Sequence, residues 1–571
     1  MTPITETPPA RANGATARAS RELARRGGAS GIEVEPRARR VRSSSVLFVA
    51  GCGLVAFALR LLLVVGVESV VSPDGVVYAG LGRSLAAGNL AGALSPFYPP
   101  LYPLLVGLSS LVFRDVEFAG RFVSVVAGAA VVLPAYALAR DSYGERVARL
   151  AAAVVALHPL LVYYSSVLLT ESAYTLALNC GVLAGWAALS RAAANTNGET
   201  LTRAAWRAHL VAGVVFGACY LIKPEAAGFV VLLVAMRTVV NFSGARRSFK
   251  RTALDCLALA AGFLLLALPY LLYLRGALGG WTISGKLRGH LWQGGGRAGE
   301  FASASLVPDY WSALAQTTKG LMNEYELFSL LFPLPFVAIS ALGLFRAGWT
   351  RARARRELYL FAFVAATLAG YAVTLPNIRF LVPLLPLLVC WLARGVVELE
   401  GWLAETLARR RSSRAIAGVA EGKVLARGDR LVGGRFFRAL VFAVLIASLM
   451  PAFVFLLRGD KWGDYHGQKL AAAWIKEHAG VAAPRIMATA PVAAFYAGGQ
   501  YVTLAEEDYD SFVARARRER ADFIIANERS LKNTPLRSLL DEGAGHPGLR
   551  VVHAISETPG HKMIVYVLAR G

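Results

Sequence analysis

The sequence predicts a polytopic α-helical membrane protein with about eleven transmembrane helices, followed by a soluble α/β domain. The 571-residue chain is 56% hydrophobic and 17% charged, with a mean hydropathy of +0.48, which is more apolar than a typical soluble domain. Its 61 lysines and arginines gather between long apolar runs. After Arg458 the apolar runs shorten and alternate with polar helical patterns, as expected of a small soluble domain.

The N-terminal segment predicts a cytoplasmic tail and an uncleaved first span. Met1 to Ser45 carries nine arginines against four glutamates and is expected to be disordered. Val46 to Val67 follows with about the length that crosses a bilayer. A signal peptide has a shorter apolar region and a small-residue cleavage site, so we expect this segment to remain as a membrane anchor.

Ten further apolar runs predict the other spans. They are Phe118 to Ala139, Val147 to Tyr164, Ser172 to Ser190, Leu210 to Ile222, Ala226 to Val240, Thr252 to Leu274, Tyr325 to Phe345, Leu358 to Leu375, Phe380 to Val397 and Ala439 to Leu457. Leu101 to Phe113 is also apolar, but a helix of that length falls short of the roughly 30 Å of hydrocarbon. Leaving it out puts the basic clusters, including Arg409 to Arg438, on the cytoplasmic side.

This predicted topology places two long loops and the C-terminal domain, residues 458–571, on the outer side of the membrane. The loops are 68–117 and 275–324. In the domain we expect helices over Lys469 to His478 and Tyr509 to Arg518, and strands at RIMAT, DFIIA, LRVVHAI and KMIVYVLA. Basic clusters between spans are typical of membrane topology, and they do not form a nucleic-acid-binding module. All five cysteines lie in apolar runs without the spacing of a disulfide framework or a zinc site.

Asp74 stands directly after the first span, in SPDGVVYAGLGRSLAAG. Ser72 and Pro73 suit the start of a helix, where an acid is favoured, so Asp74 fits a helix start and a functional carboxylate equally well. Val77, Leu81 and Leu85 recur at helical spacing. They predict an amphipathic helix at the membrane surface, with Arg83 reaching toward phosphates or water.

Further charged residues are expected near the same membrane boundary, where they usually face a cavity or a partner. In LPNIRFLVPLLP, Arg379 either snorkels from a helix end or binds a phosphate through its planar donors. Lys223 in LIKPEAAGF either binds phosphate or pairs with Glu225. Glu171 fits a helix cap or a site acid. Arg60, inside the first span, is expected to neutralise one of these acids or to snorkel outward.

Taken together, these segments resemble the GT-C superfamily of polyprenyl-phosphate-sugar glycosyltransferases. The stretch around Asp74, the prolines of SPFYPPLYPLLVGLSSLVF and the run FAGRFVSVVAGAAVVLPAYALARDSYGERVARLAAAVVALHP carry the likeness, together with LIKPEAAGF and NIRFLVPLLP. The nearest resemblance is to the family 39-like branch, which includes protein O-mannosyltransferases and aminoarabinose transferases. The resemblance implies a GT-C-like membrane domain over residues 46–457.

The resemblance also implies residue roles. Asp74 matches the catalytic carboxylate, Glu171 a second acid at a later span, and Arg379 a contact for the carrier phosphate. Two departures stand out. Asp74 is followed by Gly75 where the family usually has a second acid, and Phe97 and Tyr98 stand before the paired prolines where the aminoarabinose transferases carry charged residues. No cofactor is certain, and a divalent metal is compatible with these residues.

The sequence therefore predicts an inverting glycosyltransferase in the bacterial plasma membrane, with a polyprenyl-phosphate sugar donor and a lipid, glycan or protein acceptor. Asp74 would be the base, and Glu171 would orient the acceptor or the surroundings of Asp74. The loop 275–324 is expected to close over the donor, bringing the basic residues Lys286, Arg288 and His290. The alternatives are a transporter or lipid flippase, or a membrane scaffold that presents the C-terminal domain.

Overall fold

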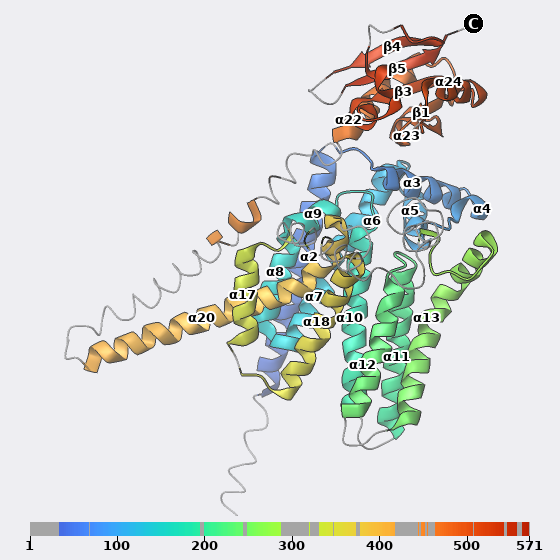
Figure 1. The fold of residues 1–571 in the computed structure, drawn as a ribbon. Helices are drawn as coiled ribbons and strands as arrows, with labels where there is room; N and C mark the ends of the chain where they lie inside the picture. The colour runs from blue at the N-terminus through green and yellow to red at the C-terminus, as the bar shows by residue number, and fades with distance from the viewer. Residues whose placement is uncertain are drawn as a thin grey trace, which may run out of the picture. The chain divides into compact units, whose positions relative to one another are not determined.

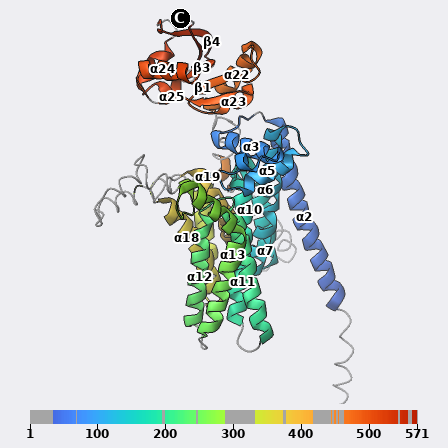
Figure 2. The same cartoon turned by 90° about the vertical axis from the view of Figure 1, so that its right-hand side faces the viewer.

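The computed structural model contains a helical part and a C-terminal α/β part (Figures 1 and 2). The residues it describes are 34–67, 69–194, 199–243, 248–286, 319, 322, 331–346, 348–372, 377–416, 443–444, 447–450, 454, 463–505, 507–541, 545–556 and 562–569. Among these residues, five helical segments are long and apolar enough to cross a membrane. They are Ser44–Gly66, Val116–Tyr143, Glu171–Ala193, Phe249–Leu278 and Ile378–Thr406.

The first of these segments belongs to α2 (Val34–Gly66), which begins before the predicted span. The predicted span from Phe118 is built of α6 (Val116–Ala130) and α7 (Val132–Tyr143). The next one is interrupted: α8 (Glu145–Leu157) and α9 (Pro159–Tyr164) are separated at His158, because proline favours the first position of a new helix. The prediction of one continuous helix from Val147 to Tyr164 is therefore wrong, because the helix is interrupted at His158.

Three short helices form the connection between α2 and α6. They are α3 (Pro73–Ala86), α4 (Leu90–Ala93) and α5 (Leu101–Ser110). With ten residues, α5 is about 15 Å long, as predicted for a run too short to span. The helices α3 and α5 approach closely at two glycines. A side chain on Gly82 would lie 2.9 Å from Val106, and one on Gly107 would lie 2.9 Å from the Gly82 carbonyl.

Four helices run side by side in the next part of the chain: α10 (Glu171–Ala194), α11 (Glu199–Tyr220), α12 (Ala226–Ser243) and α13 (Phe249–Leu278) (Figures 1 and 2). The contact between α11 and α13 is made through small residues. A Cβ on Gly213 would lie 2.1 Å from the Leu259 carbonyl oxygen, and one on Gly262 would lie 2.2 Å from that of Leu210. Such close backbone approach is typical of membrane helix pairs.

The last helices of this part are α17 (Leu334–Phe345), α18 (Arg351–Ala372), the short α19 (Ile378–Leu381), the 3-10 turn η1 (Val382–Leu384) and α20 (Leu385–Ile416). Helix α20 continues far beyond the predicted end at Val397, because the segment that follows is rich in Leu, Ala, Glu and Arg. Most of the predicted span from Ala439 lies outside the described residues. The structure thus supports a multi-span helical protein without reproducing the predicted count.

The C-terminal part is a five-stranded mixed sheet of order β2-β1-β3-β5-β4. Its strands are β1 (Arg485–Ala488), β2 (Gln500–Thr503), β3 (Phe523–Asn527), β4 (Leu549–Ile555) and β5 (Met563–Leu568). Strands β1, β2 and β3 are parallel, whereas β5 is antiparallel to β3 and β4. The four predicted strands are confirmed; the edge strand β2 was not predicted.

Helices cover both faces of this sheet. Alternate side chains of β3 point to opposite faces, as the period of a strand requires. Ile524 packs in the core with α24 (Tyr509–Arg518) and η3 (Pro535–Leu540). Ile525 packs in the core with α22 (Gly463–His478) and α23 (Val492–Ala497). All five residues of β3 are buried, so this part has its own two-sided core.

Candidate active site

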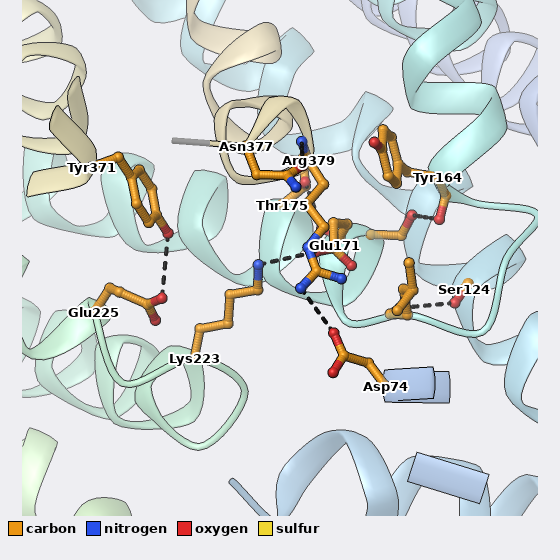
Figure 3. A network of polar contacts seen from close by, with 12 residues as sticks. Asp74, Ser124, Tyr164, Glu171, Thr175, Lys223, Glu225, Tyr371, Asn377 and Arg379 are labelled. Carbon is orange, nitrogen blue, oxygen red and sulfur yellow. Dashed lines mark hydrogen bonds and ion pairs between the residues drawn. The ribbon is translucent and has the colours of Figure 1, made fainter. Parts of the chain in front are cut away.

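Four of the predicted site residues lie where helices begin or end at one end of the bundle (Figure 3). Asp74 is in the first turn of α3, and Glu171 is the first residue of α10. Lys223 lies in the turn between α11 and α12, and Arg379 in the first turn of α19. Because α10, α11 and α12 alternate in direction, the start of α10 and the α11–α12 turn meet at the same end.

Arg379 bridges two acids from separate parts of the chain (Figure 3). Its Nη2 lies 2.8 Å from Oδ2 of Asp74, and its Nε lies 3.8 Å from Oε1 of Glu171. Asn377 fixes the start of α19, since its side chain accepts a hydrogen bond of 3.1 Å from the Arg379 backbone N–H. The Arg379 side chain is 20% exposed, so a ligand can reach its planar donors.

Glu171 is the most deeply buried acid of this cluster. Its side chain is 2% exposed, and Lys223 Nζ donates to its Oε1 at 3.2 Å. The same ammonium lies 4.7 Å from the ring centre of Phe380. Of the two alternatives for Lys223, the pairing with Glu225 is therefore wrong, and phosphate binding stays a prediction. Glu225 instead accepts a hydrogen bond of 3.4 Å from the Tyr371 hydroxyl (Figure 3).

Asp74 is both a helix-start residue and a member of the cluster, so a place at a helix start does not exclude it from the site. Ser72 caps α3 by accepting from the Gly75 N–H at 3.1 Å. Burial raises the pKa of the Asp74 carboxyl, but the charges of Arg379 and Lys286 and the hydrogen bonds from Arg379 and Tyr98 outweigh it. They hold the pKa below its usual range, so Asp74 is a carboxylate at neutral pH.

Gly75 stands where the resembling family usually has a second acid. A Cβ at this position would lie 2.7 Å from a methyl carbon of Val71 and 2.9 Å from the carbonyl oxygen of Leu168. The start of α3 therefore packs directly against the segment that precedes Glu171. This close approach leaves no room for a second carboxylate beside Asp74.

The segment after α13 packs against the loop between α4 and α5. The Gly285 N–H donates to the Pro96 carbonyl at 3.0 Å, and the Tyr270 hydroxyl donates to the Ser95 carbonyl at 2.9 Å. As a result, Lys286 Nζ lies 4.6 Å from the ring centre of Tyr98. This lysine belongs to the predicted basic loop and contributes positive charge near Asp74.

The remaining predicted residues lie elsewhere. Arg60 is fully buried and donates to the main-chain carbonyls of Ala56 at 3.0 Å and Ala156 at 2.8 Å. The predicted pairing of Arg60 with an outer acid is thus replaced by contacts to backbone. Arg83 is exposed in the last turn of α3, two turns beyond Asp74. Arg288 and His290 lie outside the described residues.

The acids of the cluster do not form a metal site as arranged. Within the described ranges, no group of three or more His, Cys, Asp and Glu side chains lies close enough to hold an ion. Asp74 and Glu171 both face Arg379. A Ca²⁺ or Mg²⁺ ion, which usually takes six or more ligands, would have to displace this guanidinium from both acids.

Sequence reasoning missed the role of Tyr98. Its hydroxyl donates to Asp74 Oδ1 at 3.0 Å, yet the sequence marks it only as an aromatic residue before paired prolines. The contact between Lys286 and Tyr98 was missed as well, because it joins two loops that are far apart in the chain. A single sequence carries no signal for such a pairing.

Comparisons with known proteins agree with this architecture. The family model of dolichyl-phosphate-mannose-protein mannosyltransferase matches residues 98–273, a range that contains Glu171 and Lys223. No curated protein matches the chain. The crystal structure of ArnT from Cupriavidus metallidurans in the apo state is similar, with a TM-score of 0.56 and 14% identity over 92% of this chain and 98% of that chain.

Two other solved structures are similar in fold. ArnT from Cupriavidus metallidurans bound to undecaprenyl phosphate has a TM-score of 0.53 and 14% identity, covering 91% of this chain and 97% of that chain. The apo oligosaccharyltransferase of Archaeoglobus fulgidus has a TM-score of 0.57 and 12% identity, covering 85% of this chain and 70% of that chain. The chain is thus a multi-pass membrane protein that shares its fold with ArnT and with the archaeal oligosaccharyltransferase, and residues 98–273 of it match the protein mannosyltransferase family model.

Proposed function

We propose that this chain is an integral membrane glycosyltransferase that moves a sugar from a polyprenyl-phosphate donor to a hydroxyl of a lipid, glycan or protein. One observation carries the proposal: Arg379 lies 2.8 Å from Asp74 and 3.8 Å from Glu171 at a helix-end cluster. A carboxylate beside a guanidinium offers both a base for a hydroxyl and donors for a phosphate. The structure of ArnT bound to undecaprenyl phosphate supports a carrier phosphate as the ligand.

The reaction begins with an exchange of partners at Arg379. The carrier phosphate of the incoming donor binds the guanidinium, and Oδ2 of Asp74 is released from its ion pair. This oxygen then takes the proton of the acceptor hydroxyl. The acceptor oxygen bonds to the anomeric carbon, while the bond from that carbon to the phosphate oxygen breaks and its electron pair stays on the phosphate. Attack opposite the leaving phosphate inverts the anomeric centre.

Glu171 and Lys223 have supporting roles in this proposal, because their opposite charges neutralise each other. With 9% of its side chain exposed, Lys223 neutralises Glu171, so it acts on the donor phosphate less directly than the sequence suggested. Glu171 in turn faces the Nε of Arg379. This arrangement keeps the guanidinium oriented after it has exchanged Asp74 for the phosphate, because a fixed partner preorganises the donors.

The site is proposed to face the extracytoplasmic side of a bacterial plasma membrane. In that orientation the N-terminal tail and the arginines at the start of α18 (Arg351–Ala372) are cytoplasmic, as the positive-inside rule requires. The domain of residues 458–571 would then be extracytoplasmic, where it is available to an acceptor. Membrane lipids and a lipid-linked donor are the expected partners, with no nucleic acid.

A transporter is the rival function. Ionic groups buried between helices could serve a transported substrate, and the helical part contains a second such cluster. Arg237 Nε lies 2.8 Å from Asp255 Oδ2, and His209 Nδ1 lies 3.7 Å from Asp255 Oδ1. Both Arg237 and Asp255 lie about two turns from the helix ends opposite the Arg379 cluster. They are buried and paired with each other, which suits a link between α12 and α13 and leaves Arg379 as the candidate ligand site.

The proposal is tested by assaying purified protein with labelled polyprenyl-phosphate sugars and hydroxyl acceptors. Asp74→Asn should lower transfer by about a hundredfold or more, because a general base contributes roughly 10²–10⁴-fold. Asp115→Asn is the matched control. Asp115 caps α6 in the same connection by accepting from the Glu117 N–H at 3.0 Å, and asparagine caps equally well. Undiminished transfer by Asp74→Asn removes Asp74 from the base role.

A further inference from the structure

The loop of paired prolines brings a tyrosine to the free oxygen of the proposed base. Arg379 occupies Oδ2 of Asp74, whereas the Tyr98 hydroxyl donates to Oδ1 at 3.0 Å. The two carboxylate oxygens therefore have different partners. If phosphate takes Arg379, the hydroxyl of Tyr98 remains as the contact that fixes the rotation of the carboxylate.

Tyr98 is itself held by two contacts to its ring. Lys286 Nζ lies over one face at 4.6 Å from the ring centre, and Tyr78 meets the ring edge-on with centroids 5.2 Å apart. Edge-to-face aromatic pairs and cation–π contacts both stabilise a ring beyond the effect of simple burial. The peptide N–H of Tyr98 also donates to Ser95 Oγ at 3.3 Å, which fixes the loop.

This aromatic contact continues toward the second acid. Tyr78 packs edge-on against Tyr102 with centroids 5.1 Å apart, and the Tyr102 hydroxyl lies 2.9 Å from Ser124 Oγ. Ser124 in turn donates to the Leu169 carbonyl at 3.3 Å. Tyr102 and Ser124 are fully buried. A continuous set of packed rings and hydrogen bonds thus connects Tyr98 with the segment directly before Glu171.

We propose that Tyr98 is a positioning residue for Asp74, holding Oδ1 through its hydroxyl so that Oδ2 points at the acceptor hydroxyl once Arg379 has turned to the donor phosphate. The inference rests on the proposed function and extends it to a residue at which this chain departs from the aminoarabinose transferases that it resembles. Lys286 supports the ring of Tyr98, and through Tyr98 it connects the second long loop with the base.

A pH profile separates this role from a purely structural one. The charged groups around Asp74 are Arg379 on α19, Lys286 after α13 and Glu171 on α10, together with the hydroxyls of Tyr78 and Tyr98. The Tyr98 hydrogen bond lowers the pKa of Asp74 by stabilising its charged form. Removing that hydroxyl raises this pKa, so the acid limb of the kcat/KM profile, which reports the free enzyme, moves to higher pH.

The test compares Tyr98→Phe with Tyr102→Phe in the full-length protein. Both changes remove a hydroxyl and keep a ring that contacts Tyr78, but the Tyr102 hydroxyl bonds Ser124 rather than Asp74. Tyr98→Phe is expected to lower kcat/KM about tenfold, the effect of a hydrogen bond to a charged group, and to shift the acid limb upward. Tyr102→Phe should leave the limb in place. Binding of undecaprenyl phosphate to both variants checks that they are folded.

The outcomes are distinguishable. A Tyr98→Phe profile that coincides with wild type, while Asp74→Asn is inactive, overturns the inference and leaves the proposed function standing. An equal shift in both tyrosine variants also overturns it, because the effect would not belong to the hydroxyl on Asp74. Full transfer by Asp74→Asn overturns the proposed function, and the positioning role falls with it.

Discussion

Arg379 Nη2 lies 2.8 Å from Asp74 Oδ2, so the cation proposed for the donor phosphate is engaged by the proposed base. The side chains are 20% and 26% exposed, which leaves both open to exchange with a ligand. A site that holds its base in an ion pair until phosphate arrives releases that base only when donor is bound.

The charge of Arg379 sets the pH at which Asp74 gains a proton. Because Arg379 lowers the pKa of Asp74 against the effect of burial, Arg379→Met raises it. The base is active above its pKa, so the acid limb of kcat/KM should move to higher pH in Arg379→Met and much less in Arg379→Lys. An acid limb that stays in place in Arg379→Met would contradict the pairing as the source of the lowered pKa.

The lowered pKa of Asp74 also makes the stability of the folded protein depend on pH. Asp74 contributes stability above the ordinary Asp pKa of about 3.9, and this contribution is lost as the pH falls through the folded-state pKa. Asp74→Asn should therefore lower the midpoint of thermal unfolding at neutral pH, with a difference from wild type that disappears in strong acid. The measurement is a series of melting curves of both proteins in detergent. A difference independent of pH would count against the ion pair.

Glu171 and Lys223 should be coupled in stability. Their side chains are 2% and 9% exposed and lie 3.2 Å apart, and removing one partner of a buried pair costs about 3–5 kcal/mol because it leaves a charge unpaired. Glu171→Gln and Lys223→Met should each destabilise the protein, whereas the double variant should cost less than the sum. A double-mutant cycle in unfolding free energy measures this. Additive losses would show that the two groups act separately.

Gly285 tests the contact between the two long loops. An alanine Cβ at this position would lie 2.4 Å from the Pro96 carbonyl oxygen, forcing a shift of about 1 Å, and misplacements of that size cost up to about a hundredfold in rate. Gly285→Ala should lower kcat/KM and leave the melting temperature near wild type. Gly276→Ala is the control, since nothing lies within 4 Å of its Cβ. Equal activity of the two variants would show that catalysis does not depend on this contact between the loops.

Much of the architecture could be predicted from one sequence, because the signals are local. Apolar runs identified the helical segments, and Ser72, Pro73 and Asp74 together marked the start of α3. The segment Tyr509–Arg518 was predicted with its observed boundaries. The edge strand β2 was missed because it is short and only one of its residues is buried, so it lacks a clear alternation of apolar residues.

Partner identity could not be predicted, because it depends on contacts between distant segments. Lys223 is two residues from Glu225 in sequence, yet it binds Glu171 from another helix. Arg60 has the charge to neutralise an acid, but its guanidinium donates hydrogen bonds to backbone carbonyls instead. The likeness to a family directed attention to Asp74, Glu171 and Arg379, whereas the contact of Tyr98 required coordinates.

Binding of undecaprenyl phosphate to the purified protein tests the central claim most directly, because it requires no acceptor. If phosphate and Asp74 compete for Arg379, Asp74→Asn should bind this ligand about fivefold more tightly than wild type, the effect of releasing an ion pair worth about 1 kcal/mol. Arg379→Met should bind at least about tenfold more weakly, and Asp115→Asn should match wild type. Weaker or unchanged binding by Asp74→Asn would contradict the exchange of Arg379 between base and donor.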